Sequence, residues 1–190
     1  MWRAVQAFQE RGYQIPKFHG KVCMNAWTWS IIFHTRDTPF TEFMDYVCAL
    51  SMVMSLFIAA VIRILHRRRT LLAILLTFTL VYFAEHARYL YSGRVDYDYN
   101  MRVNIFFGVA GSLLWLWWAL GRRYAWRVSA FTLLSGAALS LELLDFPPRR
   151  GWDAHALWHA STAPLPLLFY RFVIDDLKYS KPTLDIKKSA

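Results

Sequence analysis

The chain has 190 residues, of which 56% are hydrophobic and only 18% are charged. A soluble domain averages roughly 45–50% apolar and about 25% charged residues, so the composition argues against an ordinary soluble protein. The net charge of +9 does not indicate a nucleic-acid partner. The basic residues lie in short connections between long apolar stretches, which is the pattern of a membrane protein.

Six apolar stretches are predicted to cross a membrane as helices. Most are about twenty residues long, which spans about 30 Å of hydrocarbon, and the first is shorter. The predicted spans are 22–35, 43–65, 70–91, 102–120, 125–144 and 153–174. They place the chain in the all-α class, as a polytopic transmembrane helix bundle (22–174) between a polar N-terminal segment (1–21) and a polar tail (175–190). Thr38 before Pro39, and Asp153, are predicted to cap the second and last spans.

Lysine and arginine are unevenly divided between the two predicted faces of the membrane. Twelve lie on the face that holds the 63–69 and 121–127 connections and the C-terminal segment, and six lie on the opposite face. Short cytoplasmic loops carry an excess of basic residues. We therefore predict a cytoplasmic C-terminal tail and a lumenal or extracellular opposite face.

The candidate metal ligands lie near the predicted lumenal ends of three spans. His155 and His159, in D-A-H-A-L-W-H, are four residues apart and therefore share one face of a helix. His34 lies in the last turn of the first span, with Ser30 one turn earlier and Asp45 just inside the next span. Ionisable groups inside a bilayer are costly and usually face a bundle interior or a water-filled cavity. Because the spans alternate in direction, these side chains all fall near one face, which predicts a shared site.

Three imidazoles with an open fourth position are the ligand set of a catalytic zinc ion. Zinc lowers the pKa of its bound water to about 7 and polarises a carbonyl group. Asp45 can orient or deprotonate that water, or complete the metal shell, and Ser30 can hydrogen-bond the water or a developing oxyanion. In the alternative interpretation the histidines line a polar helix interface and Ser30 bonds back to its own helix. The predicted reaction is metal-assisted hydrolysis of an ester or amide in a lipid that enters from the bilayer.

Other polar and aromatic residues receive structural interpretations. We expect an ion pair between the Glu85–Arg88 region and a neighbouring helix, with His86 as the best candidate for a fourth or substitute ligand. Glu142 is either a hydrogen-bond partner of a ligating imidazole or a helix-terminal charge that reaches the interface. Three tryptophans near the end of the fourth span are predicted to belong to a membrane-interface belt: Trp115, Trp117 and Trp118.

The motif order resembles a known superfamily. S-x-x-x-H, an aspartate eleven residues after that histidine, and a late H-x-x-x-H resemble the CREST membrane hydrolases and receptors, which include alkaline ceramidases and adiponectin-type receptors. Longer strings resemble one branch, the post-GPI-attachment lipid-remodelling proteins, over about residues 15–180. These strings are N-A-W-T-W-S-I-I-F-H-T-R-D-T, D-Y-D-Y-N-M-R-V-N and L-E-L-L-D-F-P-P-R-R-G-W-D-A-H-A-L-W-H.

The resemblance implies a seven-span membrane hydrolase of the endoplasmic reticulum and Golgi, with its active site on the lumenal side. Its implied reaction is of phospholipase A2 type and removes the sn-2 acyl chain from the inositol phospholipid of GPI-anchored proteins. His34, His155 and His159 would be zinc ligands, and Asp45 and Ser30 would be the supporting polar pair.

Two features near the ends of the chain complete the comparison with that branch. The branch's signal peptide, cysteine-rich lumenal region and first span are not recognisable here, so we expect six spans instead of seven. The ending K-K-S-A resembles a dilysine retrieval signal, in which Lys187 and Lys188 would be recognised by a coat protein. Two other functions remain open: an amide hydrolase like the alkaline ceramidases, and a non-catalytic receptor or scaffold with structural zinc.

Overall fold

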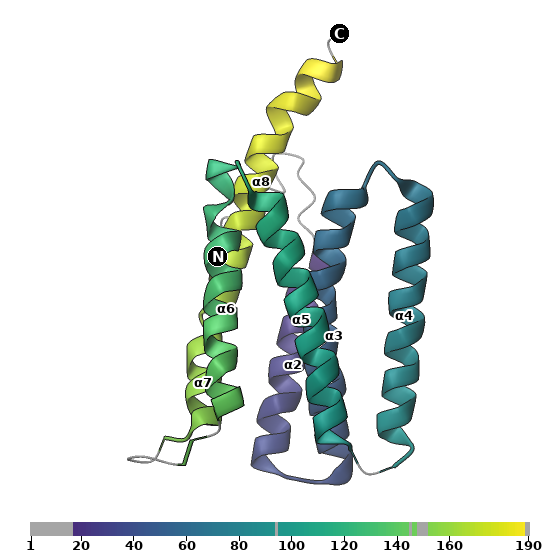
Figure 1. Ribbon diagram of the computed structural model, residues 1–190, viewed down its shortest axis with the longest axis vertical. Helices are drawn as coiled ribbons and strands as arrows, with labels where there is room; N and C mark the ends of the chain where they lie inside the picture. The colour runs from purple at the N-terminus through teal and green to yellow at the C-terminus, as the bar shows by residue number, and fades with distance from the viewer. Residues whose placement is uncertain (1–16, 94, 145, 148–151, 189–190) are drawn as a thin grey trace. The chain divides into compact units, whose positions relative to one another are not determined.

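The computed structural model describes residues 17–93, 95–144, 146–147 and 152–188, with side chains described between residues 20 and 179. Within these ranges the regular elements are helices (Figure 1), so the predicted all-α class is confirmed. The first four are α2 (Lys17–Thr35), α3 (Pro39–Leu65), α4 (Arg69–Tyr91) and α5 (Tyr97–Ala119). A short 3-10 helix, η1 (Arg123–Ala125), leads into α6 (Trp126–Leu144), which is followed by α7 (Ala154–Thr162) and α8 (Leu165–Lys188).

Both predicted helix caps are confirmed. Thr38 caps α3 with its side-chain oxygen 3.2 Å from the backbone nitrogen of Thr41, and the Thr41 hydroxyl accepts in return from the backbone of Thr38 at 2.9 Å. Pro39 follows at the first helical position, where its missing N–H costs nothing. Asp153 caps α7 by accepting from the backbone nitrogen of Ala156 at 2.7 Å. These bonds satisfy donors that a helix leaves unpaired in its first turn.

The chain forms two compact units, Met1–Leu114 and Trp115–Ala190. In the first unit α2 and α3 form an antiparallel hairpin, and Asn25 donates to the Cys48 sulfur across it at 3.0 Å. The core of this unit lies between α3 and the start of α5. Its buried members are Leu50, Met54, Val103 and Phe107, and Phe57, Tyr82 and Tyr99 pack against them.

The core of the second unit is aromatic. Trp115 and Trp118 at the end of α5 pack edge-on against Phe172 of α8, with ring centroids 5.3 and 5.7 Å apart. Both tryptophans are buried, at 4% and 7% exposed, whereas Trp117 is 61% exposed. The expected interface belt is therefore wrong for Trp115 and Trp118. The i, i+3 spacing of Trp115 and Trp118 puts them on one helix face, and that face packs on α8.

The last predicted span, 153–174, is two helices. Pro164 has no N–H and its ring clashes with the preceding turn, so it interrupts the helix between α7 and α8. The chain continues as helix through most of the expected polar tail, since α8 extends to Lys188. At the other end α2 begins at Lys17, so the first helix has 19 residues rather than the 14 of the predicted span. Residues 1–16 and the side chains of Lys187 and Lys188 lie outside the described part of the chain.

Three of the described helices are long and apolar enough to cross a membrane: Pro39–Leu65, Arg69–Tyr91 and Arg123–Leu144. The last of these joins η1 to α6. The remaining predicted spans do not meet this criterion, and the structure gives a reason for two of them. α2 begins with a polar turn at Lys17, and the last span is divided at Pro164. A total of six spans stays a prediction.

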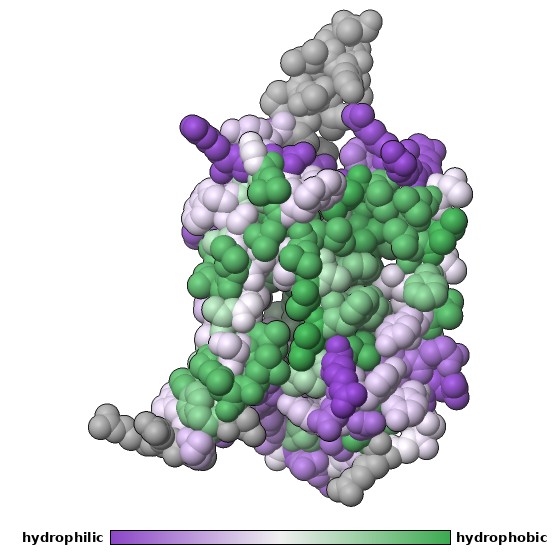
Figure 2. Space-filling view, viewed as in Figure 1, coloured by the Kyte–Doolittle hydropathy of each residue, from purple (hydrophilic) through white to green (hydrophobic). Residues whose placement is uncertain are grey.

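The surface of α4 shows why a bilayer suits this chain. Ile74, Phe78, Leu80 and Val81 are each 57–70% exposed. Figure 2 shows hydrophobic residues over this side of the first unit, with hydrophilic residues toward its ends. Large side chains of this kind are rarely gathered on the surface of a soluble monomer, and in hydrocarbon their exposure has no cost.

Close packing of α3 on α5 depends on Gly111. A Cβ atom there would lie 3.3 Å from Phe57 Cα and 3.5 Å from Phe57 N, both backbone atoms that cannot rotate away. We predict that Gly111→Leu lowers the melting temperature of the detergent-solubilised protein, because overpacking costs roughly 1–3 kcal/mol. Gly136→Leu is the matched control, since a Cβ there meets nothing within 4 Å. Equal melting temperatures for the two variants would contradict this account of α3–α5 packing.

Candidate metal centre

The second unit holds a close pair of imidazoles on α7. His155 and His159 lie one turn apart, and their Nε2 atoms are 3.0 Å from each other. The ring centroids are 4.6 Å apart and the rings are nearly perpendicular, at 89°. The sequence prediction that this pair shares one helix face is confirmed, and the two rings present the same nitrogen to one point.

Glu142 near the end of α6 orients this pair. Its Oε2 atom lies 2.7 Å from Nδ1 of His155, and its side chain is only 9% exposed. A carboxylate at that distance accepts a hydrogen bond from Nδ1–H, which favours the tautomer with its lone pair on Nε2. Of the two sequence interpretations of Glu142, the hydrogen-bond partner is therefore the one that the structure supports. A carboxylate behind a ligating histidine is the usual second partner of a zinc-bound imidazole.

The donor set fits a zinc ion. Zn–N bonds of about 2.0–2.1 Å at a tetrahedral angle would put two ligand nitrogens about 3.3 Å apart. The observed Nε2 separation of 3.0 Å is close to that value, so little movement is needed to share a metal. The side chain of His155 is 44% exposed, which leaves the pair open on one side.

Local sequence explains why α7 holds the pair so closely. The helix has nine residues, begins at the Asp153 cap and ends just before Pro164. The backbone nitrogen of Ala163 still donates to the carbonyl of His159 at 3.0 Å, so the last turn is intact. Trp158 lies against both imidazoles, with ring centroids 5.5 and 4.6 Å away. This tryptophan is not among the predicted site residues, although its place between the two histidines was the available signal.

The other predicted site residues lie at the closed end of the α2–α3 hairpin in the first unit. Ser30 is buried, at 8% exposed, and His34 is exposed in the last turn of α2 with its ring 5.2 Å from that of Phe33. Asp45 is half-buried in the second turn of α3. The hairpin thus brings Ser30, His34 and Asp45 to one end of one unit. That His34 joins the imidazole pair of the second unit stays a prediction.

His86 has a structural role in the first unit. It is 1% exposed, its Nε2 lies 3.2 Å from Asn100 Oδ1, and its ring stacks on that of Tyr99 at 5.2 Å. These contacts account for Nε2 and the ring face of His86, whereas its buried Nδ1 has no hydrogen-bond partner among the described residues, so a ligand role for His86 stays a prediction. The expected ion pair with a neighbouring helix is wrong, because Glu85 and Arg88 pair with each other at 2.8 Å along α4. Their i, i+3 spacing on an exposed helix face makes that pairing the nearest available one.

The fold and the carboxylate-held imidazole pair define a polytopic helical membrane protein with a candidate metal centre. Residues 21–177 match the Per1-like family, and the chain belongs to this family. The resemblance noted in the sequence to post-GPI-attachment remodelling proteins is thereby confirmed. No solved structure is significantly similar to the chain.

Several curated proteins are related over most of the chain. A Cricetulus griseus protein named GPI-specific phospholipase A2-like PGAP3 is 42% identical, over 94% of this chain and 74% of its own length. The Xenopus laevis protein of that name is 35% identical, also over 94% of this chain and 74% of its own length. Post-GPI attachment to proteins factor 3 of Drosophila melanogaster is 36% identical over 91% of this chain and 71% of its own length. The Xenopus laevis alignment runs over 237 positions, more than the 190 residues present here, so that relative has residues that this chain lacks.

The role of Glu142 can be tested by its effect on metal affinity. We predict that Glu142→Gln weakens zinc binding by roughly 10–100-fold, because a neutral amide no longer holds His155 in the tautomer that presents Nε2. Competition with a zinc-chelating dye measures the affinity of the purified full chain. Glu85→Gln is the control, since that carboxylate is exposed and pairs along α4. Equal zinc affinities of wild type and Glu142→Gln would show that Glu142 does not support metal binding.

Proposed function

We propose that this chain is a zinc-dependent lipid hydrolase that removes the sn-2 acyl chain from the inositol phospholipid of GPI-anchored proteins. The observation that carries the proposal is the imidazole pair on α7, with its Nε2 atoms 3.0 Å apart and His155 held by Glu142. Membership of the Per1-like family and the names of its GPI-specific phospholipase A2-like relatives supply the substrate class.

In this proposal His34, His155 and His159 hold the zinc ion, and each offers one ring nitrogen. The metal would supply Lewis-acid activation of a water molecule and of the ester carbonyl. We assign His34 to this pair because of the motif order and because the predicted alternation of the spans puts it on the same face of the membrane. Three histidines leave a fourth position open, as catalytic rather than structural zinc requires.

The other polar residues of the hairpin take the remaining roles. Asp45 accepts a proton from the attacking water, whose oxygen bonds to the acyl carbonyl carbon. The bond to the sn-2 oxygen then breaks, and the proton passes to that oxygen, which leaves a fatty acid and a lysolipid. Ser30 donates a hydrogen bond to the developing oxyanion, which stabilises the transition state relative to the ester.

The surroundings of His34 suit a lipid substrate. Ile31, next to Ser30, is 66% exposed, and Phe40 at the start of α3 is 56% exposed. Apolar side chains beside the ligand would lie against acyl chains, so the ester can approach from the bilayer. We also propose a lumenal site in the endoplasmic reticulum and Golgi, with coat-protein recognition of Lys187 and Lys188 on the cytoplasmic side.

The assignment of His34 as third ligand has a direct test. We predict that His34→Ala lowers the zinc content of the purified protein, as His155→Ala and His159→Ala do, because three-histidine sites lose affinity when one ligand is removed. His66→Ala is the matched control, because His66 is exposed and its Nδ1 lies 3.1 Å from the carbonyl of Arg63. Elemental analysis of bound zinc is the measurement. Full zinc in His34→Ala would exclude it from the centre.

The reaction itself is tested by fatty-acid release from a GPI phospholipid in mixed micelles. We predict that Ser30→Ala and Asp45→Asn lower turnover by at least roughly 100-fold while zinc content stays near that of wild type, the effect expected when an oxyanion donor or a base is lost. Ser51→Ala is the control for Ser30, since Ser51 bonds to the carbonyl of Cys48 within its own helix.

The same assay separates the competing functions. Release of fatty acid from ceramide alone would show that the substrate is an amide and not an ester. Bound zinc without hydrolysis of either lipid would favour a receptor or scaffold. Complementation of a remodelling-deficient cell by this chain, six predicted spans included, would show whether it works in the membrane.

A further inference from the structure

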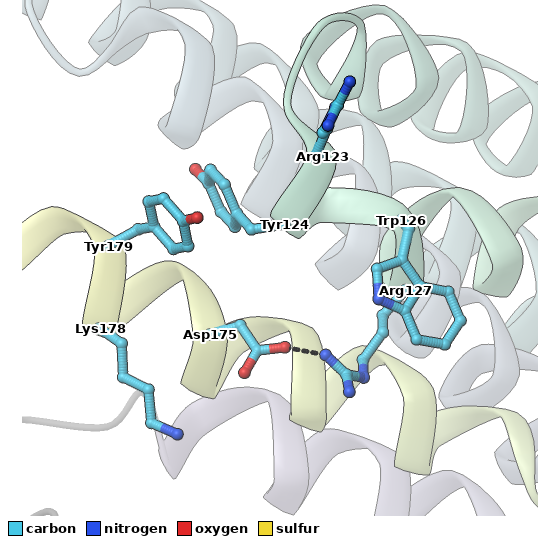
Figure 3. Close-up of a pocket in the computed structure, with 7 residues that line it drawn as sticks. All are labelled: Arg123, Tyr124, Trp126, Arg127, Asp175, Lys178 and Tyr179. Carbon is cyan, nitrogen blue, oxygen red and sulfur yellow. Dashed lines mark hydrogen bonds and ion pairs between the residues drawn. The ribbon is translucent and has the colours of Figure 1, made fainter.

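A second candidate site lies at the basic end of the second unit, formed by η1, the start of α6 and the middle of α8. The structure has a cavity there of about 410 Å³, shown in Figure 3. Three cationic, three aromatic and one acidic side chain line it: Arg123, Arg127, Lys178, Tyr124, Trp126, Tyr179 and Asp175. None of these residues belongs to the proposed zinc centre.

The cavity carries an excess of positive charge. Three cationic residues line the cavity and only one carboxylate does, that of Asp175, which pairs with Arg127 between α8 and α6. The guanidinium of Arg127 also lies over the ring of Trp126, 4.7 Å from its centroid. The bond to Asp175 leaves from Nη1 of Arg127, and a guanidinium has five N–H donors in all. The ion pair therefore fixes the side chain without using up its donors.

Aromatic side chains line the cavity beside these charged groups. Tyr124 and Tyr179 stack with ring centroids 4.0 Å apart and planes 14° apart, and the Tyr124 hydroxyl donates to Asp176 at 2.9 Å. Figure 3 shows the two tyrosines facing each other on one side of the ion pair and Trp126 on the other side. Trp126 and Tyr179 are 55% and 61% exposed. Exposed tryptophan and tyrosine at the end of a predicted span are typical of the headgroup level of a membrane.

We propose that this cavity binds the phosphate headgroup of an anionic phospholipid in the cytoplasmic leaflet. The predicted orientation puts this basic end of α6 on the cytoplasmic side, where the leaflet surface is negative. Arg127 donates to phosphate oxygens in the geometry that guanidinium groups favour, and Arg123 and Lys178 at the rim of the cavity add positive charge. The exposed rings lie against the glycerol and the upper acyl chains. The bound lipid ties α6 to α8 and stabilises the second unit.

Phosphatidic acid is the simplest probe, because its headgroup is a phosphate alone. We predict that the purified full chain, in phosphatidylcholine nanodiscs doped with phosphatidic acid, retains phosphatidic acid over phosphatidylcholine in native mass spectrometry. Arg123→Gln with Lys178→Gln removes two charges but leaves the Arg127–Asp175 pair intact. This double variant should lose on the order of tenfold in preference, because each basic residue near the surface contributes appreciably to anionic-lipid binding.

The matched control is Arg67→Gln with Arg68→Gln, in the exposed connection between α3 and α4 on the same predicted face. It removes the same charge outside the cavity and should keep the preference. A similar loss in both double variants would mean that the charge of the face, and not the cavity, attracts the lipid, and would overturn the proposal. No preference in the wild type would also overturn it. So would soluble glycerol 3-phosphate competing as well as the lipid, since the ligand would then be a free phosphate.

Discussion

The contact between Glu142 and His155 is the interaction on which the candidate centre depends. Two neutral imidazoles four residues apart can turn their rings in many ways, and most of these do not direct two lone pairs at one point. A mostly buried carboxylate 2.7 Å from Nδ1 removes that freedom for His155, because it accepts a hydrogen bond from Nδ1–H and so leaves the lone pair on Nε2. The perpendicular ring of His159 has its own Nε2 only 3.0 Å away. The two Nε2 atoms would therefore bind one metal ion together in the proposed centre.

The short length of α7 is part of the same arrangement. Isolated helices of nine residues are not stable in water, so α7 needs help from its ends and from its neighbours. Asp153 pairs a free N–H at the start, Pro164 sets the end, and α6 packs along the side. The break at Pro164 separates the helix that bears the two histidines from α8. The axis of α7 can therefore have a different direction from that of α8, and it can be oriented so that His155 reaches Glu142.

Within the second unit, α6 carries two kinds of chemistry at its two ends. Its C-terminal turn supplies Glu142 to the imidazole pair, and its first turn supplies Arg127 to the lined cavity with Asp175. At 1.5 Å per residue its 19 residues span about 28 Å, close to the thickness of the hydrocarbon. A helix of this length can place its two ends near opposite surfaces of a membrane, which is the arrangement that the division of basic residues predicts. The proposed hydrolytic site on one side and the proposed phosphate-binding cavity on the other are compatible with one crossing helix.

The sequence by itself determined the helical class, the capped starts of α3 and α7, and the pairing of His155 with His159, because each depends on residues within one or two turns of one another. Tertiary structure decided which side chains meet between helices. Glu142 is the partner of His155 because α6 packs beside α7. Packing also buries Trp115 and Trp118 against α8, and it buries His86 between helices of the first unit. Such contacts depend on how helices pack and rotate, and hydropathy and charge counts carry no information on rotation. Distances between side chains on different helices are therefore decided only by the tertiary structure.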